Sequence, residues 1–460
     1  MVPAVLLLAF LSASTAPDVG VWIPARWPSH DVKSLSTVRE TPVNCLLLEQ
    51  RDWDPAFIAA AREKGIATLG VIRPDGQAVD AARAATAARI TGIALEGDFS
   101  AQVRKAIESL NVFVVPLPSR SDLRLDSSTA VVGTWQGMWP GIQIQKNGVA
   151  VSAPSGAPWI DTNAGFLRFV RSEAHGRPVW VANTPPAGMA ISTERYMQAI
   201  ADAESEGAHW VIALDDDFTH RLLAGEAKAV AEWRRMGGLL AFYASHPEWR
   251  TMRPYSSLAL IEDVNSGALL AGGIMDMLAA KHTTVLPVPL HSFDREALDG
   301  TTLAVDVDPA SLTSAQTDVL KAWTRSGNTL LTAPPGWKMP MPENADHIVL
   351  SKEQIAQLGE IWHELNSLLN SRNPGAKVFN APGAISNLLA APGGRPLVLQ
   401  LVNYSDYPVE DVTVRLPGKF TSAKMLEPGA PPKPVDLFED GGVTEVSIPR
   451  FGVVAAVVLD

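Results

Sequence analysis

The chain has 460 residues, of which 47% are hydrophobic and 19% are charged, and its formal net charge is −11. This length predicts two or three domains, and the hydrophobic share is ample for folded cores and excludes a disordered chain. The acidic balance argues against nucleic acid as a partner, because nucleic-acid binding needs clusters of Lys and Arg that this sequence lacks.

The only strongly apolar run near the N-terminus is PAVLLLAFLSA, residues 3–13. It is too short to span a bilayer and resembles the hydrophobic region of a secretory signal. Small residues follow it, and Ala16 fits the end of a cleavage site, although no Lys or Arg precedes the run. We expect a signal peptide over residues 1–16 and an exported chain, periplasmic or extracellular; the alternative is a buried N-terminal strand.

From residue 19 to about residue 245, short apolar runs alternate with helical patterns, as in a parallel sheet with crossover helices. Eight runs read as strands: Val19–Pro24, Val43–Glu49, Ala67–Arg73, Gly92–Glu96, Val112–Leu117, Ala130–Trp135, Pro178–Asn183 and Trp210–Asp215. The clear helical patterns are Pro55–Lys64, Ala78–Ala88, Ala101–Leu110, Gly165–Glu173, Thr193–Glu206 and Ala224–Tyr243. Eight such units predict a (β/α)8 TIM barrel over residues 17–252, and a doubly wound open sheet is the alternative.

The pattern changes after the predicted barrel. Residues 253–340 alternate strands and helices and predict a smaller flavodoxin-like α/β domain. Residues 341–374 read as a connector that contains one helix, Lys352–Leu369. Residues 375–460 consist of strand patterns separated by turn residues and predict a small antiparallel β-sandwich.

This order of barrel, flavodoxin-like domain and β-domain resembles the architecture of family 42 β-galactosidases, whose middle domain is similar to a class I amidotransferase domain and serves assembly. The resemblance covers nearly the whole chain after the predicted signal peptide. It implies a glycoside hydrolase and a homo-oligomer held by the middle domain. Because Cys45 lies far outside that domain, no glutaminase nucleophile is expected there.

The same resemblance implies an acid/base Glu at the end of strand four, after an Asn, and a nucleophilic Glu at the end of strand seven. Here strand four ends in Leu95-Glu96, so the Glu is present without the Asn. Strand seven ends in Ala182-Asn183-Thr184 and carries no acid. The sequence therefore has one of the two acids at the expected place.

Hydrolysis of a glycosidic bond needs two carboxyl groups, one protonated and one ionised. Glu96 is the candidate general acid/base, and an ion-paired strand end is its alternative role. Asp161 and Asp215 are the candidates for the ionised partner. Each of these two also reads as the N-cap of the helix that follows it.

Polar and aromatic residues near the predicted strand ends are candidates for binding sugar, because indole rings stack on sugar faces and amides bond to hydroxyl groups. These candidates are Trp135, Gln136, Trp139, Trp159, Asn163, Asn183, Arg73 and Glu49. For the two Trp residues after strand six, a place in the core is the alternative. For Arg73 the alternative is an ion pair with Glu49 or Glu96, which would lower the pKa of that acid.

The sequence has no HxH, HExxH, GxSxG, GxGxxG or P-loop motif, so we expect no metal, no cofactor and no esterase chemistry. The motifs and architecture together predict a hydrolase of oligo- or polysaccharides. The alternative is a non-catalytic carbohydrate-binding or scaffold protein, which an ion pair between Glu96 and Arg73 would favour.

Overall fold

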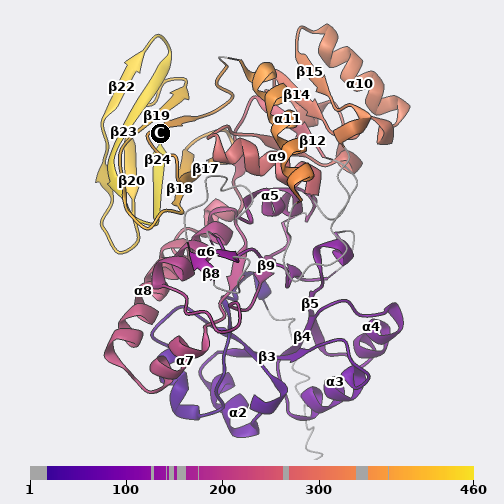
Figure 1. The fold of residues 1–460 in the computed structure, drawn as a ribbon, viewed down its shortest axis with the longest axis vertical. Helices are drawn as coiled ribbons and strands as arrows, with labels where there is room; N and C mark the ends of the chain where they lie inside the picture. The colour runs from indigo at the N-terminus through magenta and orange to yellow at the C-terminus, as the bar shows by residue number, and fades with distance from the viewer. Residues whose placement is uncertain are drawn as a thin grey trace, which may run out of the picture.

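The computed structural model describes residues 18–125, 129–140, 142–144, 150–152, 162–174, 176–262, 269–337, 351–370 and 372–460. Figure 1 shows three groups of elements: an indigo-to-magenta group below, and an orange and a yellow group beside each other above it. The predicted signal peptide lies outside the described residues, so export stays a prediction.

The first group contains parallel strands in two sheets. The larger sheet has the order β1-β2-β3-β4-β5, with the strands Pro24–Arg26, Cys45–Leu48, Ala67–Ile72, Gly92–Glu96 and Phe113–Leu117. The smaller has the order β10-β9-β6, with the strands His209–Val211, Val179–Ala182 and Val132–Thr134.

Backbone hydrogen bonds join the two sheets at both of their edges. Next to β1, the amide of Arg26 donates to the carbonyl of Ile212 at 2.7 Å. Beyond β5, the amide of Trp135 donates to the carbonyl of Pro118 at 3.2 Å. The strands of both sheets therefore follow one another around a common interior.

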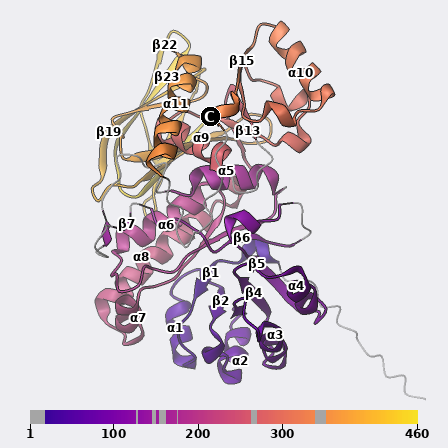
Figure 2. The same ribbon diagram turned by 45° about the vertical axis from the view of Figure 1, so that its right-hand side comes forward.

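Helices cover the outside of these strands (Figure 2). They are α1 Leu35–Val38, α2 Pro55–Glu63, α3 Ala78–Ala87, α4 Ala101–Glu108, α5 Ala164–Glu173, α6 Thr193–Ser205, α7 Asp216–Leu223 and α8 Ala227–Ala244. A separate hairpin pairs β7 Ile142–Ile144 with β8 Ala150–Ser152. Local sequence signals explain where these helices begin. At the start of α2, for example, Asp54 accepts a hydrogen bond from the amide of Phe57 at 2.8 Å, and Pro55 occupies the first helical position.

Two sequence predictions in this group are wrong in detail. The segment Val19–Val21 forms a 3-10 turn, and the first strand begins at Pro24. The predicted helix Ala224–Tyr243 begins three residues later than expected, as α8 Ala227–Ala244, because Gly225 adopts φ +75° and separates α8 from α7.

The common interior of the two sheets is filled by apolar side chains from nearly all of these strands. Its buried members are Val19, Trp22, Cys45, Leu47, Leu69, Val71, Ala94, Val115, Leu117, Val131, Trp180, Ala182 and Val211. Cys45 is fully buried, and burial raises the pKa of its thiol, as is typical of an unreactive core cysteine.

The second group is a parallel sheet of order β13-β12-β14-β15, with the strands Leu286–Val288, Leu258–Ile261, Leu303–Asp306 and Thr329–Thr332. Its helices are α9 Leu269–Ala280, α10 Ser314–Arg325 and α11 Lys352–Leu369. Ser351 and Gln354 form a capping box, which accounts for the agreement of α11 with the predicted bounds. Within the described residues, no helix is both long and apolar enough to cross a membrane.

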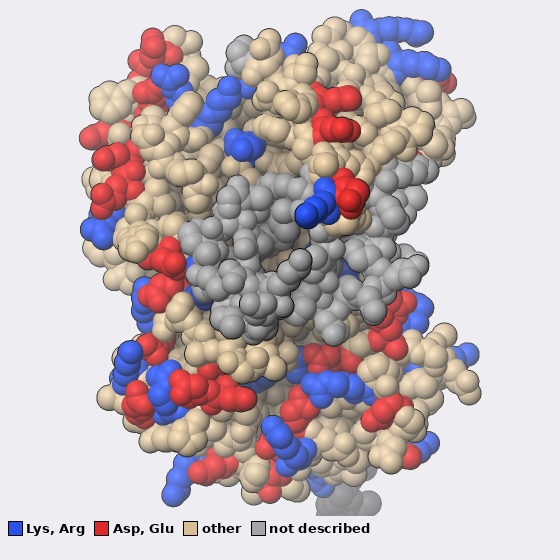
Figure 3. Space-filling model, viewed as in Figure 1, with Lys and Arg blue, Asp and Glu red and all other residues tan. Residues whose placement is uncertain are grey.

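The third group holds two antiparallel sheets, as the sequence predicts for this end of the chain. The first has the order β11-β17-β18-β24-β20-β21, with the strands Arg253–Pro254, Ala384–Ala390, Leu397–Asn403, Val454–Leu459, Ala423–Leu426 and Lys433–Pro434. The second has the order β16-β19-β23-β22, with the strands Lys377–Phe379, Val409–Pro417, Val443–Phe451 and Leu437–Asp440. Figure 3 shows acidic and basic side chains intermixed over the described part of the face that it draws.

The three groups meet at α5 and α6 through buried polar side chains. Arg168 of α5 lies 2.8 Å from Glu206 and donates to the carbonyl of Ser386 at 3.0 Å. Asn387 donates to Glu206 at 3.0 Å. Arg168 is 6% exposed and Glu206 is 2% exposed, so this ion pair joins the first group to β17 away from water.

Two buried carboxylates complete this junction. The hydroxyl of Tyr404 donates to Asp202 of α6 at 2.6 Å, and the amide of Asn163 donates to the same carboxylate at 2.9 Å. Asp276 of α9 accepts from the amide of Gly165 at the start of α5. Burial raises the pKa of Asp202 to about 6 and the pKa of Asp276 well above its ordinary value.

Replacing Arg168 by Met should lower the free energy of unfolding by about 3–5 kcal/mol, because Glu206 is then left as a buried charge without its cation. Chemical denaturation monitored by far-UV circular dichroism measures this change. The exposed Arg325 at the end of α10 provides the control, and Arg325→Met should leave stability close to that of the parent. Equal stability of the two variants would contradict the structural role of the ion pair.

Asp202 should make stability fall as the pH rises. Its folded pKa of about 6 exceeds the ordinary value of 3.8, so between these values the folded chain binds more protons than the unfolded chain. The parent should therefore lose on the order of 3 kcal/mol relative to Asp202→Asn as the pH rises through this window. Urea unfolding of both proteins along a pH series tests this. If the free energies of unfolding of the two proteins changed with pH in the same way, the pKa of Asp202 would not be raised in the folded state.

Candidate functional site

Four charged side chains lie together at the carboxyl ends of β1 to β4, and we call them the charge quartet. They are Arg26, Glu49, Arg73 and Glu96, each the last residue of its strand or the first residue after it. Because neighbouring parallel strands end at the same edge of the sheet, their terminal side chains are brought together. The sequence predicted three of these residues as site residues and missed Arg26.

Arg73 connects the two acids of the charge quartet. Its guanidinium donates to both oxygens of Glu49, each at 2.8 Å, and lies 2.8 Å from Oε2 of Glu96. Arg26 also pairs with Glu96, and its Nη1 lies 3.6 Å from Oε1 of Glu49. The ion pair that the sequence analysis named as an alternative for Arg73 is therefore present with both acids.

These contacts set the charge state of the group. The hydrogen bonds from Arg73 hold the pKa of the Glu49 carboxyl below its usual range, and the bonds to Glu49 raise the pKa of Arg73. The Glu96 side chain is 11% exposed and touches two guanidinium groups. Both oxygens of Glu96 are therefore engaged in ion pairs.

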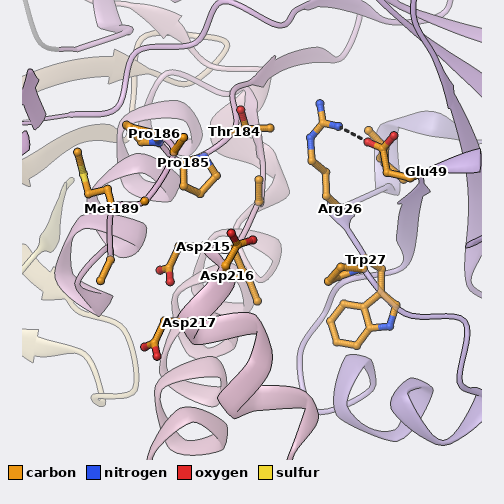
Figure 4. A pocket seen from close by; sticks show the side chains of 17 residues that line it. Arg26, Trp27, Glu49, Thr184, Pro185, Pro186, Met189, Asp215, Asp216 and Asp217 are labelled. Atoms are coloured by element: carbon orange, nitrogen blue, oxygen red, sulfur yellow. Dashed lines mark ion pairs between the residues drawn. The ribbon is translucent and has the colours of Figure 1, made fainter. Parts of the chain in front are cut away.

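A cavity of about 410 Å³ opens beside the charge quartet, at the carboxyl ends of β1, β2, β9 and β10. We call it the mouth cavity. Figure 4 shows Arg26, Trp27 and Glu49 on one wall. The facing wall carries the segment 184–190 and the three acids Asp215, Asp216 and Asp217 (Figure 4).

The three aspartates of the mouth cavity have different surroundings. Asp215 is buried and caps α7: it accepts from the amide of Phe218 at 2.9 Å and from the hydroxyl of Tyr196 at 2.8 Å. Asp217 is 2.8 Å from Arg221. Asp216 is exposed, and its carboxylate forms no ion pair within the part of the chain that the structure describes. Asp216 is thus the acid on this wall that remains available to a ligand.

The aromatic candidates after β6 pack into the protein. Trp139 is 6% exposed, its ring centroid lies 4.9 Å from that of Trp210, and its indole N–H donates to the carbonyl of Thr184 at 3.0 Å. Trp135 is half-buried against the interior of the two sheets. These placements match the core alternative better than a sugar-stacking role.

The amide candidates hold loops together. Gln136 accepts from the amide of Arg120 at 2.7 Å, Asn163 donates to Asp202 at 2.7 Å, and Asn183 donates to the carbonyl of Gly137 at 2.6 Å. All three are buried. The candidates Trp159 and Asp161 lie outside the described residues.

Sequence reasoning missed Arg26 and did not single out Asp216 from the run Asp215 to Asp217. Arg26 ends its strand in the sequence PAR, but the expected strand stopped at Pro24 and so left the Arg in a loop. Asp216 stands in a run of three acids whose separate roles depend on where α7 begins. Within the described residues, no group of three or more His, Cys, Asp or Glu side chains is arranged to hold a metal ion.

Comparison with known proteins finds solved structures that resemble this chain but no match to its sequence. No protein-family model matches the chain, and no curated protein matches it. Among solved structures, α-L-fucosidase isoenzyme 2 from Paenibacillus thiaminolyticus has a TM-score of 0.60 at 11% identity over 95% of this chain and 99% of that chain. This likeness shows that the chain has a glycoside-hydrolase-like fold.

Two further glycosidases are similar at lower scores. A rhamnosidase from Novosphingobium sp. PP1Y has a TM-score of 0.44 at 12% identity, over 89% of this chain and 39% of that chain. A noncanonic maltogenic α-amylase from Thermotoga neapolitana has a TM-score of 0.40 at 9% identity, over 96% of this chain and 100% of that chain.

Replacing Arg73 by Met should raise the pKa of Glu49, because the carboxylate loses the partner that donates two hydrogen bonds and keeps only the more weakly acting Arg26 and Arg51. The lowered pKa stabilises the folded state above the unfolded pKa, so the variant should also lose stability near neutral pH but not in acid. Carboxyl ¹³C NMR titration measures the first effect. Arg83→Met, on the exposed face of α3, is the control and should leave the titration of Glu49 unchanged.

Proposed function

We propose that the chain is a glycoside hydrolase that cleaves an oligo- or polysaccharide in the mouth cavity. The observation that carries this proposal is the pair of acids on facing walls of that cavity, Glu49 and Asp216, in a chain with a glycoside-hydrolase-like fold. The fold alone does not establish activity, since one fold serves many functions. The two facing carboxylates are what fit this chemistry.

The two parallel sheets of the first group are proposed to form one (β/α)8 barrel. Hydrogen bonds join them at both edges, and a single apolar cluster fills their interior. In such barrels the active site lies at the carboxyl ends of the strands, where the mouth cavity is found. The flavodoxin-like assignment of the second group, the sandwich packing of the third, the family 42 relationship and a homo-oligomer built through the second group remain proposals.

The two acids receive different roles from their surroundings. Glu49, which Arg73 keeps ionised, would stabilise or attack the anomeric carbon. Asp216 is exposed on the facing wall and would give its proton to the leaving oxygen as the glycosidic bond breaks. Water would then add to the anomeric carbon and replace that proton.

Glu96 has a positioning role in this proposal, in place of the proton donor that the sequence analysis expected. It contacts both arginines of the charge quartet and so fixes the guanidinium that orients Glu49. Asp215, the expected partner, is occupied as the cap of α7.

A second function is a carbohydrate-binding protein without turnover. The observation that favours it is the double ion pair of Glu96, because both oxygens of the acid at the strand-four position are engaged by arginines. Both functions place a sugar in the mouth cavity, and they differ in whether Asp216 and Glu49 complete a hydrolytic pair.

Glu49→Gln and Asp216→Asn should each lower kcat/KM on the most reactive aryl glycoside of a substrate panel by about 10²- to 10⁴-fold. Asp217→Asn is the matched control, because Asp217 is the next residue on α7 and is paired with Arg221. Its activity should stay close to that of the parent.

The same assay separates the two functions. A parent protein that binds oligosaccharides by calorimetry but hydrolyses no substrate of the panel would replace the hydrolase with the binding protein. Full activity of Asp216→Asn would remove this residue as the proton donor.

A further inference from the structure

A second cavity, of about 710 Å³, lies between the first and third groups of elements. We call it the sheet cavity. One side is formed by the 3-10 turn Pro247–Arg250 that follows α8, and the other by the six-stranded sheet. It shares no lining residue with the mouth cavity. Clefts between domains are common places for ligands.

The floor of the sheet cavity is a row of side chains across four adjacent strands. Val398 is paired with Val458, Val458 with Lys424, and Lys424 with Pro434. Residues in one such row share a face of the sheet. Val398 is only 2% exposed, so the accessible part of the row runs from Val458 to Pro434 over two strand spacings, about 10 Å. The floor is therefore mainly apolar and carries one ammonium group, and it is wide enough for more than one sugar ring.

The facing side presents a stacked pair of rings. The imidazole of His246 lies 4.2 Å from the indole of Trp249, at an interplanar angle of 14°. Nδ1 of His246 is 2.8 Å from the carbonyl of Phe242, so this nitrogen is the one that donates. In the neutral ring Nε2 is then an acceptor. Trp249 is buried, whereas His246 is half-exposed, so the imidazole is the ring face that a ligand meets.

Charges of both signs border the sheet cavity. Lys424, Glu248 and Asp460 line it and are exposed, and Lys424 and Glu248 form no ion pair within the described residues. A strongly anionic ligand would face Glu248 and Asp460, and a strongly cationic one would face Lys424. A neutral ligand with many hydroxyl groups suits both, because hydroxyls accept from an ammonium and donate to a carboxylate or an imidazole nitrogen.

We propose that the sheet cavity is a second glycan-binding site, which takes a neutral polysaccharide chain. The apolar faces of the sugar rings lie on the aliphatic row and on the imidazole of His246, and the hydroxyl groups bond to Lys424, Glu248 and Nε2 of His246. The inference rests on the proposed function insofar as the protein acts on carbohydrate. The site would hold a long substrate while the mouth cavity takes another part of the chain.

Affinity electrophoresis in native gels tests the site. The gels contain soluble starch, mixed-linkage β-glucan, arabinoxylan or galactan, and the dissociation constant follows from the retardation. The parent should be retarded by at least one of these. Lys424→Ala and His246→Ala should each raise that dissociation constant by about fivefold or more. Lys64→Ala, an exposed Lys after α2, is the control and should bind as the parent does.

Thermal unfolding shows whether His246→Ala remains folded. If it does not, the test of the site depends on Lys424→Ala alone, because Lys424 is exposed and its replacement should not unfold the protein. The proposal fails if the parent is retarded by none of the four polysaccharides, or if both variants bind as tightly as the parent. The assay involves no bond cleavage, so it can succeed where the proposed hydrolysis fails. Retained retardation of Glu49→Gln would show that binding does not depend on the mouth cavity.

Discussion

The arrangement of the chain depends on charges that are buried where α5 and α6 meet the other two groups. Arg168 and Glu206 are nearly inaccessible to water, and neither is tolerable there without the other. The ion pair also bonds to β17, and Asp202 bonds to Tyr404. Each contact is directional, so the third group has one position that satisfies all of them. The walls of the sheet cavity, which come from two groups, keep their spacing for this reason.

The charges of the charge quartet are also paired with one another, but at a position that is more exposed to water. Two arginines and two glutamates balance at the ends of four neighbouring strands, and Arg73 is half-exposed. A neutral quartet needs no counter-ion and keeps its geometry, but it also ties both acids to cations. The proposed hydrolysis therefore takes its proton from an acid outside the quartet, the exposed Asp216 on the facing wall.

The sequence predicted most parallel strands and helices because apolar runs and caps are local signals. The helix Lys352–Leu369 was predicted with its observed bounds, since its capping box stands in the sequence. The third group was predicted as a small antiparallel β-sandwich, but without the pairing of its strands. Several of its strands are short or exposed, such as Lys433–Pro434, and depend on a partner strand distant in sequence. No local pattern reports such pairing.

The contacts of the site residues could not be predicted for a different reason: the sequence gives residue types at strand ends but not their partners. Glu96 was placed correctly at the end of β4, yet its role is decided by Arg26, seventy residues earlier in the chain. Asp215, Asp216 and Asp217 are chemically alike in the sequence, and only the start of α7 assigns one to a cap, one to an ion pair and one to the cavity. Function here follows from the pairing of charges, and pairing is a property of the fold.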